Sequence, residues 1–223
     1  MTRFPGIGSG TIETLKWLAL ILMVGEHWMR HVVVSLPPWV YACGRLVFPL
    51  FVFSLALGLR SLPLHKLRSV TLRMFAWAIV AQATLQFVDA PERQLNVLFT
   101  FAFGLAIVFG FESLRSPFVQ ALGLGAVAVA AIWCEFGPVG VGFVAATIVL
   151  ARAADPPAAA WVVVAGLLAA LAVPNGNHWA LAAVPVAWLV WRFGIRMPRI
   201  RGAFYWAYAL QFPVFAAARL MMT

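Results

Sequence analysis

The chain has 223 residues, of which 64% are hydrophobic and only 10% charged, with a formal net charge of +9 at pH 7. This composition leaves too little polar surface to cover a water-soluble globule, so soluble enzymes and soluble binding modules are excluded. The basic residues lie mostly beside apolar runs, which indicates membrane topology and phospholipid contacts and argues against a nucleic-acid partner.

Apolar runs separated by proline, glycine and charged residues predict an all-α, polytopic transmembrane bundle of about nine helices, because one span needs roughly 20 apolar residues. The expected spans cover residues 13–34, 39–59, 70–88, 95–111, 117–134, 138–151, 158–173, 178–192 and 203–220. The later spans are short. Without a linker or internal repeat, residues 1–223 are expected to form a single transmembrane domain.

The distribution of basic residues predicts that the amino terminus faces the cytoplasm. With nine alternating spans, the inside set is Arg3, Lys16, Arg60, Lys66, Arg68, Arg73, Arg115, Arg152, Arg192, Arg196, Arg199 and Arg201. The outside set is then Arg30, Arg45, Arg93 and Arg219. This asymmetry satisfies the positive-inside rule, and the reverse orientation would invert it.

The first span carries an unusual stripe of ionisable residues. On a helix of 3.6 residues per turn, one face holds Glu13, Lys16, Leu20, Met23, His27 and His31, with Glu26 and Arg30 on its flanks. Charges in hydrocarbon are costly, so the stripe is expected to face the bundle interior or an aqueous cavity. Near the span ends, Lys16 and Arg30 could instead be anchors that reach the headgroups.

His27 lies about 21 Å along this helix from its start, in the outer half of the membrane, where it cannot easily reach water. A neutral imidazole there suits general-base work, and the neighbouring Glu26 could favour the imidazolium that results. The alternatives are structural: His27 could be satisfied by a neighbouring helix, and Glu26 could pair with Arg30 four residues on.

The second span places Arg45 several residues inside its outer boundary and Pro49 in mid-helix. A proline there is expected to bend the helix and free a backbone carbonyl. The guanidinium of Arg45 offers a planar fork for a carboxylate, carbonyl or phosphate group, although pairing with Glu26 alone would also explain it.

Several segments resemble one family of membrane proteins. The segment LKWLALILMVGEH at 15–27 is similar to the TraX opening LK-x-x-A-x-x-x-M-x-x-DH, and GRLVFPLFVF at 44–53 resembles its GR-x-x-FPLF block. LNVLFTFAFGLA at 95–106 resembles the segment L-N-x-L-F-T, and weaker similarities occur at 133–142 and 201–212. The resemblance therefore extends over nearly the whole chain.

This resemblance implies a multi-pass protein of the bacterial inner membrane that acetylates the amino terminus of conjugative pilin. TraX proteins look related in plan to other transmembrane acyltransferases, so acetyl-CoA is the implied donor. The resemblance assigns His27 as the catalytic residue, with Glu26 beside it, and Lys16 as a contact for the CoA phosphates, because that group separates a basic residue and a histidine by ten residues. Direct transfer to the amine is the expected route, and an acetyl-imidazole intermediate on His27 is the alternative.

Two positions depart from the family pattern. The usual aspartate before the histidine is Glu26, which keeps the charge. The late YPLHL-like stretch reads Tyr208, Ala209, Leu210, Gln211 and Phe212, so a second histidine is replaced by Gln211. This replacement suggests either a different acceptor or a late helix that is only structural.

Further candidate residues complete the expected site. The inner loop from Arg60 to Arg73 is expected to receive the CoA head through Arg60, Arg68 and Arg73, unless it serves topology alone. Arg192, Arg196, Arg199 and Arg201 form a second inner cluster with the same ambiguity. Arg45 and His31 are the expected substrate-binding residues, and the outer acidic residues Asp89, Glu92 and Glu135 could attract an amine. Asn96, Asn175, Asn177 and His178 are expected to cap helices.

The expected function is acetyl transfer from acetyl-CoA to an amine of a pilin or another small membrane protein within the lipid bilayer. No metal is expected, since Cys43 and Cys134 stand apart with no ligand spacing. A protein that only holds pilin before assembly is one alternative, and it predicts no cavity. A small proton-coupled transporter is another, and an internal inverted repeat would favour it.

Overall fold

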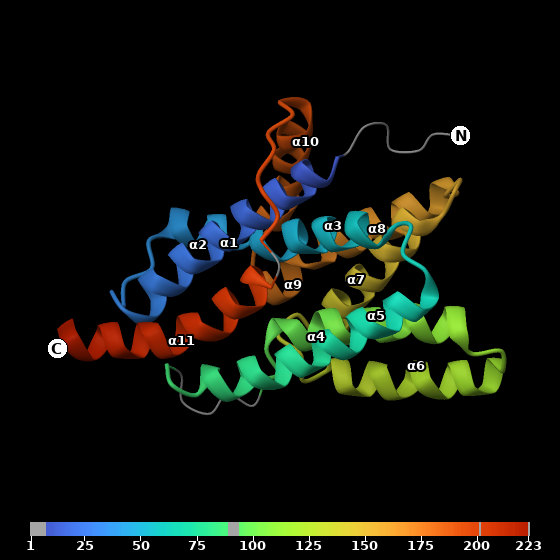
Figure 1. Cartoon of the computed structure of the whole chain (residues 1–223), viewed down its shortest axis with the longest axis horizontal. Helices are drawn as coiled ribbons and strands as arrows, with labels where there is room; N and C mark the ends of the chain where they lie inside the picture. The colour runs from blue at the N-terminus through green and yellow to red at the C-terminus, as the bar shows by residue number, and fades with distance from the viewer. Residues whose placement is uncertain (1–7, 89–93, 201, 223) are drawn as a thin grey trace.

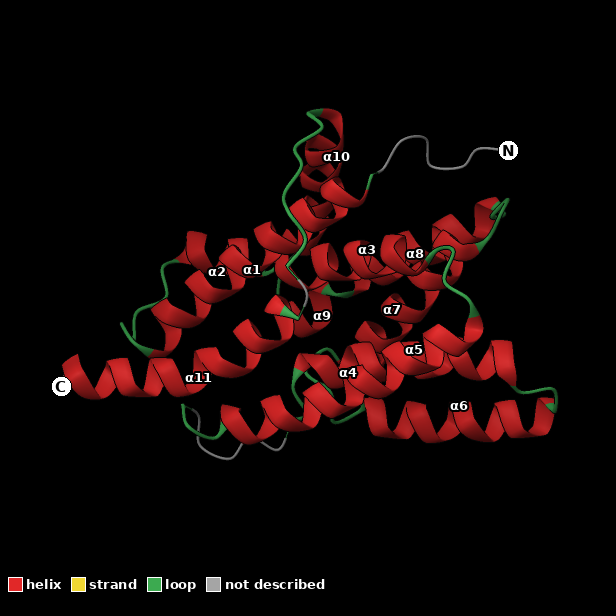
Figure 2. Ribbon diagram, viewed as in Figure 1, coloured by secondary structure: helices red, strands yellow, loops and turns green. Residues whose placement is uncertain are grey.

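The computed structural model describes residues 8–88, 94–200 and 202–222, and these ranges contain helices and turns with no strand (Figure 2). The all-α fold predicted from the sequence is therefore confirmed. The predicted roles of Arg3, Asp89, Glu92, Arg93 and Arg201 lie outside the described residues.

The described residues form nine helical rods, in agreement with the nine predicted spans. Six rods are single helices: α1 (Ser9–His31), α4 (Leu64–Leu85), α5 (Val97–Ser113), α6 (Pro117–Ala131), α7 (Gly137–Arg152) and α11 (Ala203–Met222). The other three each join two pieces: α2 (Pro38–Gly44) with α3 (Val47–Leu59), α8 (Ala158–Ala170) with α9 (Ala172–Asn175), and the 3-10 turn η1 (Trp179–Ala182) with α10 (Ala183–Arg192).

The second rod breaks before its proline. The helix is interrupted at Arg45 and Leu46, so Pro49 is the third residue of α3. The amide groups of a first helical turn have no intrahelical partner, so a proline costs little there. The predicted bend at Pro49 is thus displaced to the preceding turn, which holds Arg45.

The expected inner loop from Arg60 to Arg73 is mostly helical. Only the turn at 60–63 is irregular, and α4 begins at Leu64, six residues before the predicted start of this span. Leu67 and Met74 are buried on one face of α4, which stabilises the helix although Lys66 and Arg68, on the two flanks of that face, are exposed.

In the described part of the chain, the helices pack around four clusters of buried apolar residues, of which one is the largest. α5 packs against α4 and α7, and α3 packs against α1 and α7, while α11 lies against α1 and α4 (Figure 1). The main core contains Val52, Leu67, Leu105, Phe143 and Leu171, which are fully buried. In Figure 1, α10 is steeply inclined to the long axis that most other rods follow.

Two stretches of the structure are long and apolar enough to cross a membrane by length and composition: Pro38–Leu59 and Ala158–Asn175. Four further helices are apolar but shorter: Val97–Ser113, Pro117–Ala131, Gly137–Arg152 and Trp179–Arg192. Large apolar side chains are also exposed on the outer helices, among them Phe118 and Leu122 on α6 and Val162 on α8.

Candidate functional site

A cavity of about 1050 Å³ lies between α1, α3, α4, α5 and α11. Its volume is in the range of sites that enclose a small-molecule ligand. Lys16, Glu26, His27, His31 and Arg45 all line this cavity, so the ionisable stripe of α1 faces the interior of the protein.

The cavity extends along two antiparallel helices. On α1, Lys16 precedes His27 by eleven positions, which is about 16 Å along the helix axis. On α3, the order is reversed, because Arg45 comes just before its first residue and Arg60 just after its last. The cavity therefore has a basic end near Lys16 and Arg60 and a second end near His27 and Arg45.

Only some of the basic residues predicted to bind the CoA head lie at the basic end of the cavity. Arg60 and Arg73 line the cavity, and Lys66 does so as well, but Arg68 does not. Of the second inner cluster, Arg199 borders the cavity, whereas Arg192 and Arg196 do not. The helical periodicity of α4 explains why Lys66 and Arg73 line the cavity and Arg68 does not. Positions 66 and 73 lie on the same face of the helix, and position 68 lies on the opposite side.

Glu13 and Lys16 form an ion pair at this end, with the Lys16 ammonium 2.8 Å from a Glu13 carboxylate oxygen. The Arg199 guanidinium is 3.9 Å from the same oxygen. Arg199 is brought there by the segment before α11, in which the Ile195 carbonyl accepts a hydrogen bond from the Thr14 hydroxyl at 2.9 Å. The sequence placed Glu13 in the ionisable stripe of α1. Its contact with Arg199 exists only because the segment before α11 packs on α1.

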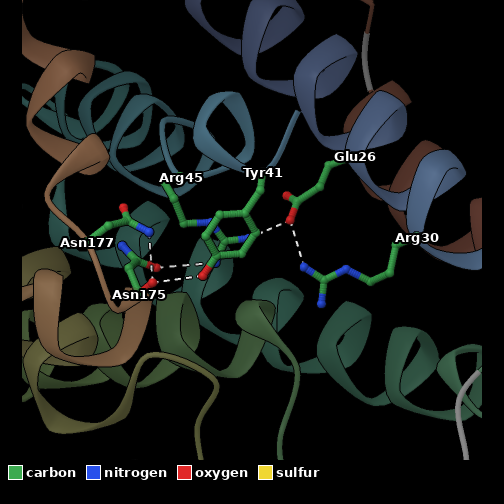
Figure 3. A network of polar contacts seen from close by, with 6 residues as sticks. All are labelled: Glu26, Arg30, Tyr41, Arg45, Asn175 and Asn177. Carbon is green, nitrogen blue, oxygen red and sulfur yellow. Dashed lines mark hydrogen bonds and ion pairs between the residues drawn. The ribbon is translucent and has the colours of Figure 1, made fainter. Parts of the chain in front are cut away.

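The opposite end is organised around the Glu26 carboxylate (Figure 3). Its Oε1 atom accepts a hydrogen bond from Arg30 at 2.7 Å and one from Arg45 at 2.5 Å. Both pairings considered from the sequence are thus present at once. Among the described residues no hydrogen bond joins Glu26 to His27.

Arg45 is held from a second direction by α9. Its guanidinium donates to the Asn175 side-chain oxygen at 3.3 Å and lies 4.5 Å from the centre of the Tyr41 ring. The Tyr41 hydroxyl and the Asn177 amide both donate to the Asn175 carbonyl (Figure 3). Sequence reasoning missed Tyr41, and the only signal was that a buried arginine needs several partners.

Gly44 permits the close approach of the first two rods. A Cβ atom at this position would overlap the Glu26 carboxylate. Glu26 can reach Arg45 only because position 44 has no side chain. This explains the glycine that precedes Arg45 in the GRLVFPLF segment.

The predicted capping residues have different roles. Asn96 caps α5 as expected, because its side-chain oxygen accepts a hydrogen bond from the Leu98 amide. The Asn177 side chain accepts one from the Trp179 amide, but Asn177 lies one residue before the N-cap position of η1. For Asn175 the capping prediction is wrong, because its side-chain oxygen is turned toward Arg45. His178 precedes η1 but makes no side-chain capping bond.

His27 is enclosed by aromatic rings and by α11. The ring centroids of His27 and Phe212 are 5.7 Å apart, and those of His27 and His31 are 5.8 Å apart. Its Nδ1 atom is buried and has no hydrogen-bond partner among the described residues. His27 also lines the cavity, so an imidazole lies at the end of the cavity away from Lys16 and Arg60.

Comparison with known proteins identifies the family. A family model described as TraX protein matches residues 11–219. No curated protein and no solved structure gives a significant match. Because the matching model covers nearly the whole chain, the protein belongs to the TraX family.

Proposed function

We propose that the protein is a multi-pass acetyltransferase of the bacterial cytoplasmic membrane that moves an acetyl group from acetyl-CoA to an amine. The observation that carries this proposal is that one continuous cavity joins a cationic end with an imidazole about 16 Å away along α1. This separation is comparable to the length of an extended pantetheine arm. The amino terminus of a conjugative pilin is the acceptor that fits the family.

A membrane location is supported by the apolar helices and by the exposed Phe118, Leu122 and Val162, since large apolar patches are rare on soluble monomers. The amino terminus is proposed to face the cytoplasm, where acetyl-CoA is available. The basic end would then open toward the donor.

The cationic residues would bind the donor phosphates. Lys16, Arg60, Lys66, Arg73 and Arg199 border the cavity, and charge-assisted bonds to phosphate are strong when they are partly desolvated. The Lys16 ammonium is paired with Glu13, so a donor phosphate would compete for this contact.

His27 would act as the general base. An α-amino group has a pKa of about 8 and is largely protonated at neutral pH, so it must lose a proton before it attacks. Once the ammonium has released one proton to solvent, the neutral amine nitrogen would form a bond to the thioester carbonyl carbon while His27 takes a second proton from that nitrogen. The carbon–sulfur bond then breaks, CoA leaves as a thiolate, and the proton returns from His27 to the sulfur.

A non-enzymatic protein that only holds pilin would not require this cavity. The cavity and its charged lining favour the acetyltransferase over that alternative.

The test is acetyl transfer by the purified protein in lipid nanodiscs with isotopically labelled acetyl-CoA and a candidate pilin. Intact-mass spectrometry should show one added acetyl group on the pilin. The matched controls are a pilin with a blocked amino terminus and the variants His27→Gln and His178→Gln, of which only the second should remain active. His178 is exposed and does not line the cavity. Absence of transfer to every amine offered would contradict the proposal.

A further inference from the structure

α11 brings a polar side chain to the buried side of His27. Gln211 is 5% exposed and Phe212 1% exposed, and the Phe212 ring packs on the His27 imidazole. The Gln211 side chain lies next to the same imidazole. The late helix is therefore a wall of the candidate site, at the position where the family resemblance leads one to expect a second histidine.

The two nitrogens of His27 have different surroundings. Nδ1 is enclosed by protein and has no partner among the described residues. Nε2 is not among the enclosed, unpartnered atoms, and no hydrogen bond within the described ranges satisfies it. Since His27 lines the cavity, Nε2 is the ring nitrogen that a ligand can reach.

Among the residues that the structure describes, the Gln211 side chain has one atom that makes a hydrogen bond, Nε2, and one that does not, Oε1. Its Nε2 atom donates to the Tyr208 carbonyl at 3.1 Å, which directs the amide. Its Oε1 atom is buried and has no partner in the described part of the chain. A buried acceptor without a partner thus lies beside an imidazole whose buried nitrogen also lacks one, and pairing them would satisfy both groups.

We infer that Gln211 is a positioning residue that holds His27 in the Nδ1–H tautomer. A small rotation lets Nδ1–H donate to Gln211 Oε1, so the lone pair remains on Nε2, toward the cavity. Fixing the tautomer through the second ring nitrogen is how a base is kept ready to accept a proton. That His27 acts as a base rests on the proposed function, whereas the tautomer itself does not.

Glu26 is not available for this task. Among the described residues, Glu26 accepts hydrogen bonds from Arg30 and Arg45, both through Oε1, and the bond to Arg45 directs that oxygen toward the junction of α2 and α3 (Figure 3). An amide oxygen from α11 fixes the imidazole without adding a negative charge beside the ring. The replacement of histidine by Gln211 would therefore preserve a hydrogen-bonding role at this position.

The experiment is nitrogen-15 NMR of the protein labelled at its four histidines and reconstituted in nanodiscs. The His27 signals are assigned by their loss in His27→Gln. We expect a protonated Nδ1 and an unprotonated Nε2 in the wild type, and a mixture of both tautomers in Gln211→Leu. Phe212→Leu, which alters packing on the same ring without removing an acceptor, should keep the wild-type tautomer.

Acetyl transfer provides the second measurement. Gln211→Leu should lower kcat about ten- to a hundred-fold with little change in KM, because removing a group that orients a reactive histidine has effects of this size. Gln120→Leu on α6 removes a glutamine that donates to the Leu114 carbonyl outside the cavity, and it should leave kcat unchanged.

The outcomes separate the two proposals. A protonated Nε2 in the wild type, or an unchanged spectrum in Gln211→Leu, would overturn the role of Gln211. If the expected tautomer is observed but no acetyl group is transferred by the wild type, the inference about Gln211 stands and the proposed function fails.

Discussion

Arg45 donates to Glu26 at 2.5 Å and thereby ties the start of α3 to α1 at the wall of the cavity. The side chains are 15% and 5% exposed, so the pair is largely removed from solvent. The Arg30 side chain, which binds the same oxygen of Glu26, is 45% exposed. The two arginines should therefore contribute differently to stability.

Arg45→Ala should destabilise the protein by about 3 kcal/mol or more, because breaking a buried ion pair leaves an uncompensated charge. Arg30→Ala should cost less than about 1 kcal/mol, since an exposed pair is screened by solvent. Denaturation in mild detergent measures both, and a double-mutant cycle with Glu26→Gln isolates each coupling. Equal coupling energies for the two arginines would contradict the assignment.

Gly44→Ala should lower the melting temperature and weaken the contact between Glu26 and Arg45. The added methyl group would occupy the position of the Glu26 carboxylate. The matched control is Gly166→Ala in α8, where a Cβ would meet nothing within 4 Å. That substitution should be neutral or stabilise by up to about 1 kcal/mol, because alanine is the better helix former.

His27→Gln should reduce acetyl transfer by about 10² to 10⁴-fold while leaving folding intact, as expected for the loss of a general base. Glutamine keeps a hydrogen-bonding side chain but cannot take a proton near neutral pH. The rate under saturating donor is the quantity to measure. Near-normal turnover would show that His27 is only a structural partner.

Lys16→Ala and Arg73→Ala should raise the Kd for acetyl-CoA with a smaller effect on the saturated rate, because a phosphate contact stabilises ground and transition states alike. Arg68→Ala should leave the Kd nearly unchanged, since Arg68 does not border the cavity. Binding of CoA to each variant by calorimetry checks the pattern. If Arg68→Ala weakened CoA binding as much as Arg73→Ala does, the cavity would not be the donor site.

Alkaline-phosphatase fusions at the turn 60–63 or within 194–200 should be inactive, because the positive-inside rule places both segments in the cytoplasm. A fusion after His31 should be active. High activity at the first two sites would reverse the orientation and with it the proposed route of the donor.

The sequence by itself determined the helical class, the nine rods and the ionisable stripe of α1. These features follow from local composition and from a period of 3.6 residues, which do not depend on distant contacts. Short segments such as LKWLALILMVGEH were likewise enough to indicate the family and the candidate role of His27.

Only the tertiary structure decided which polar groups meet. Arg45 and Asn175 are 130 positions apart in the sequence. Neither segment by itself indicates that the Asn175 side chain binds the Arg45 guanidinium instead of capping a helix. The same holds for Gln211 beside His27 and for the exclusion of Arg68 from the cavity. Each depends on how rods distant in the sequence pack and on the exact turn at which a helix begins, and a buried polar side chain binds whichever partner that packing brings to it.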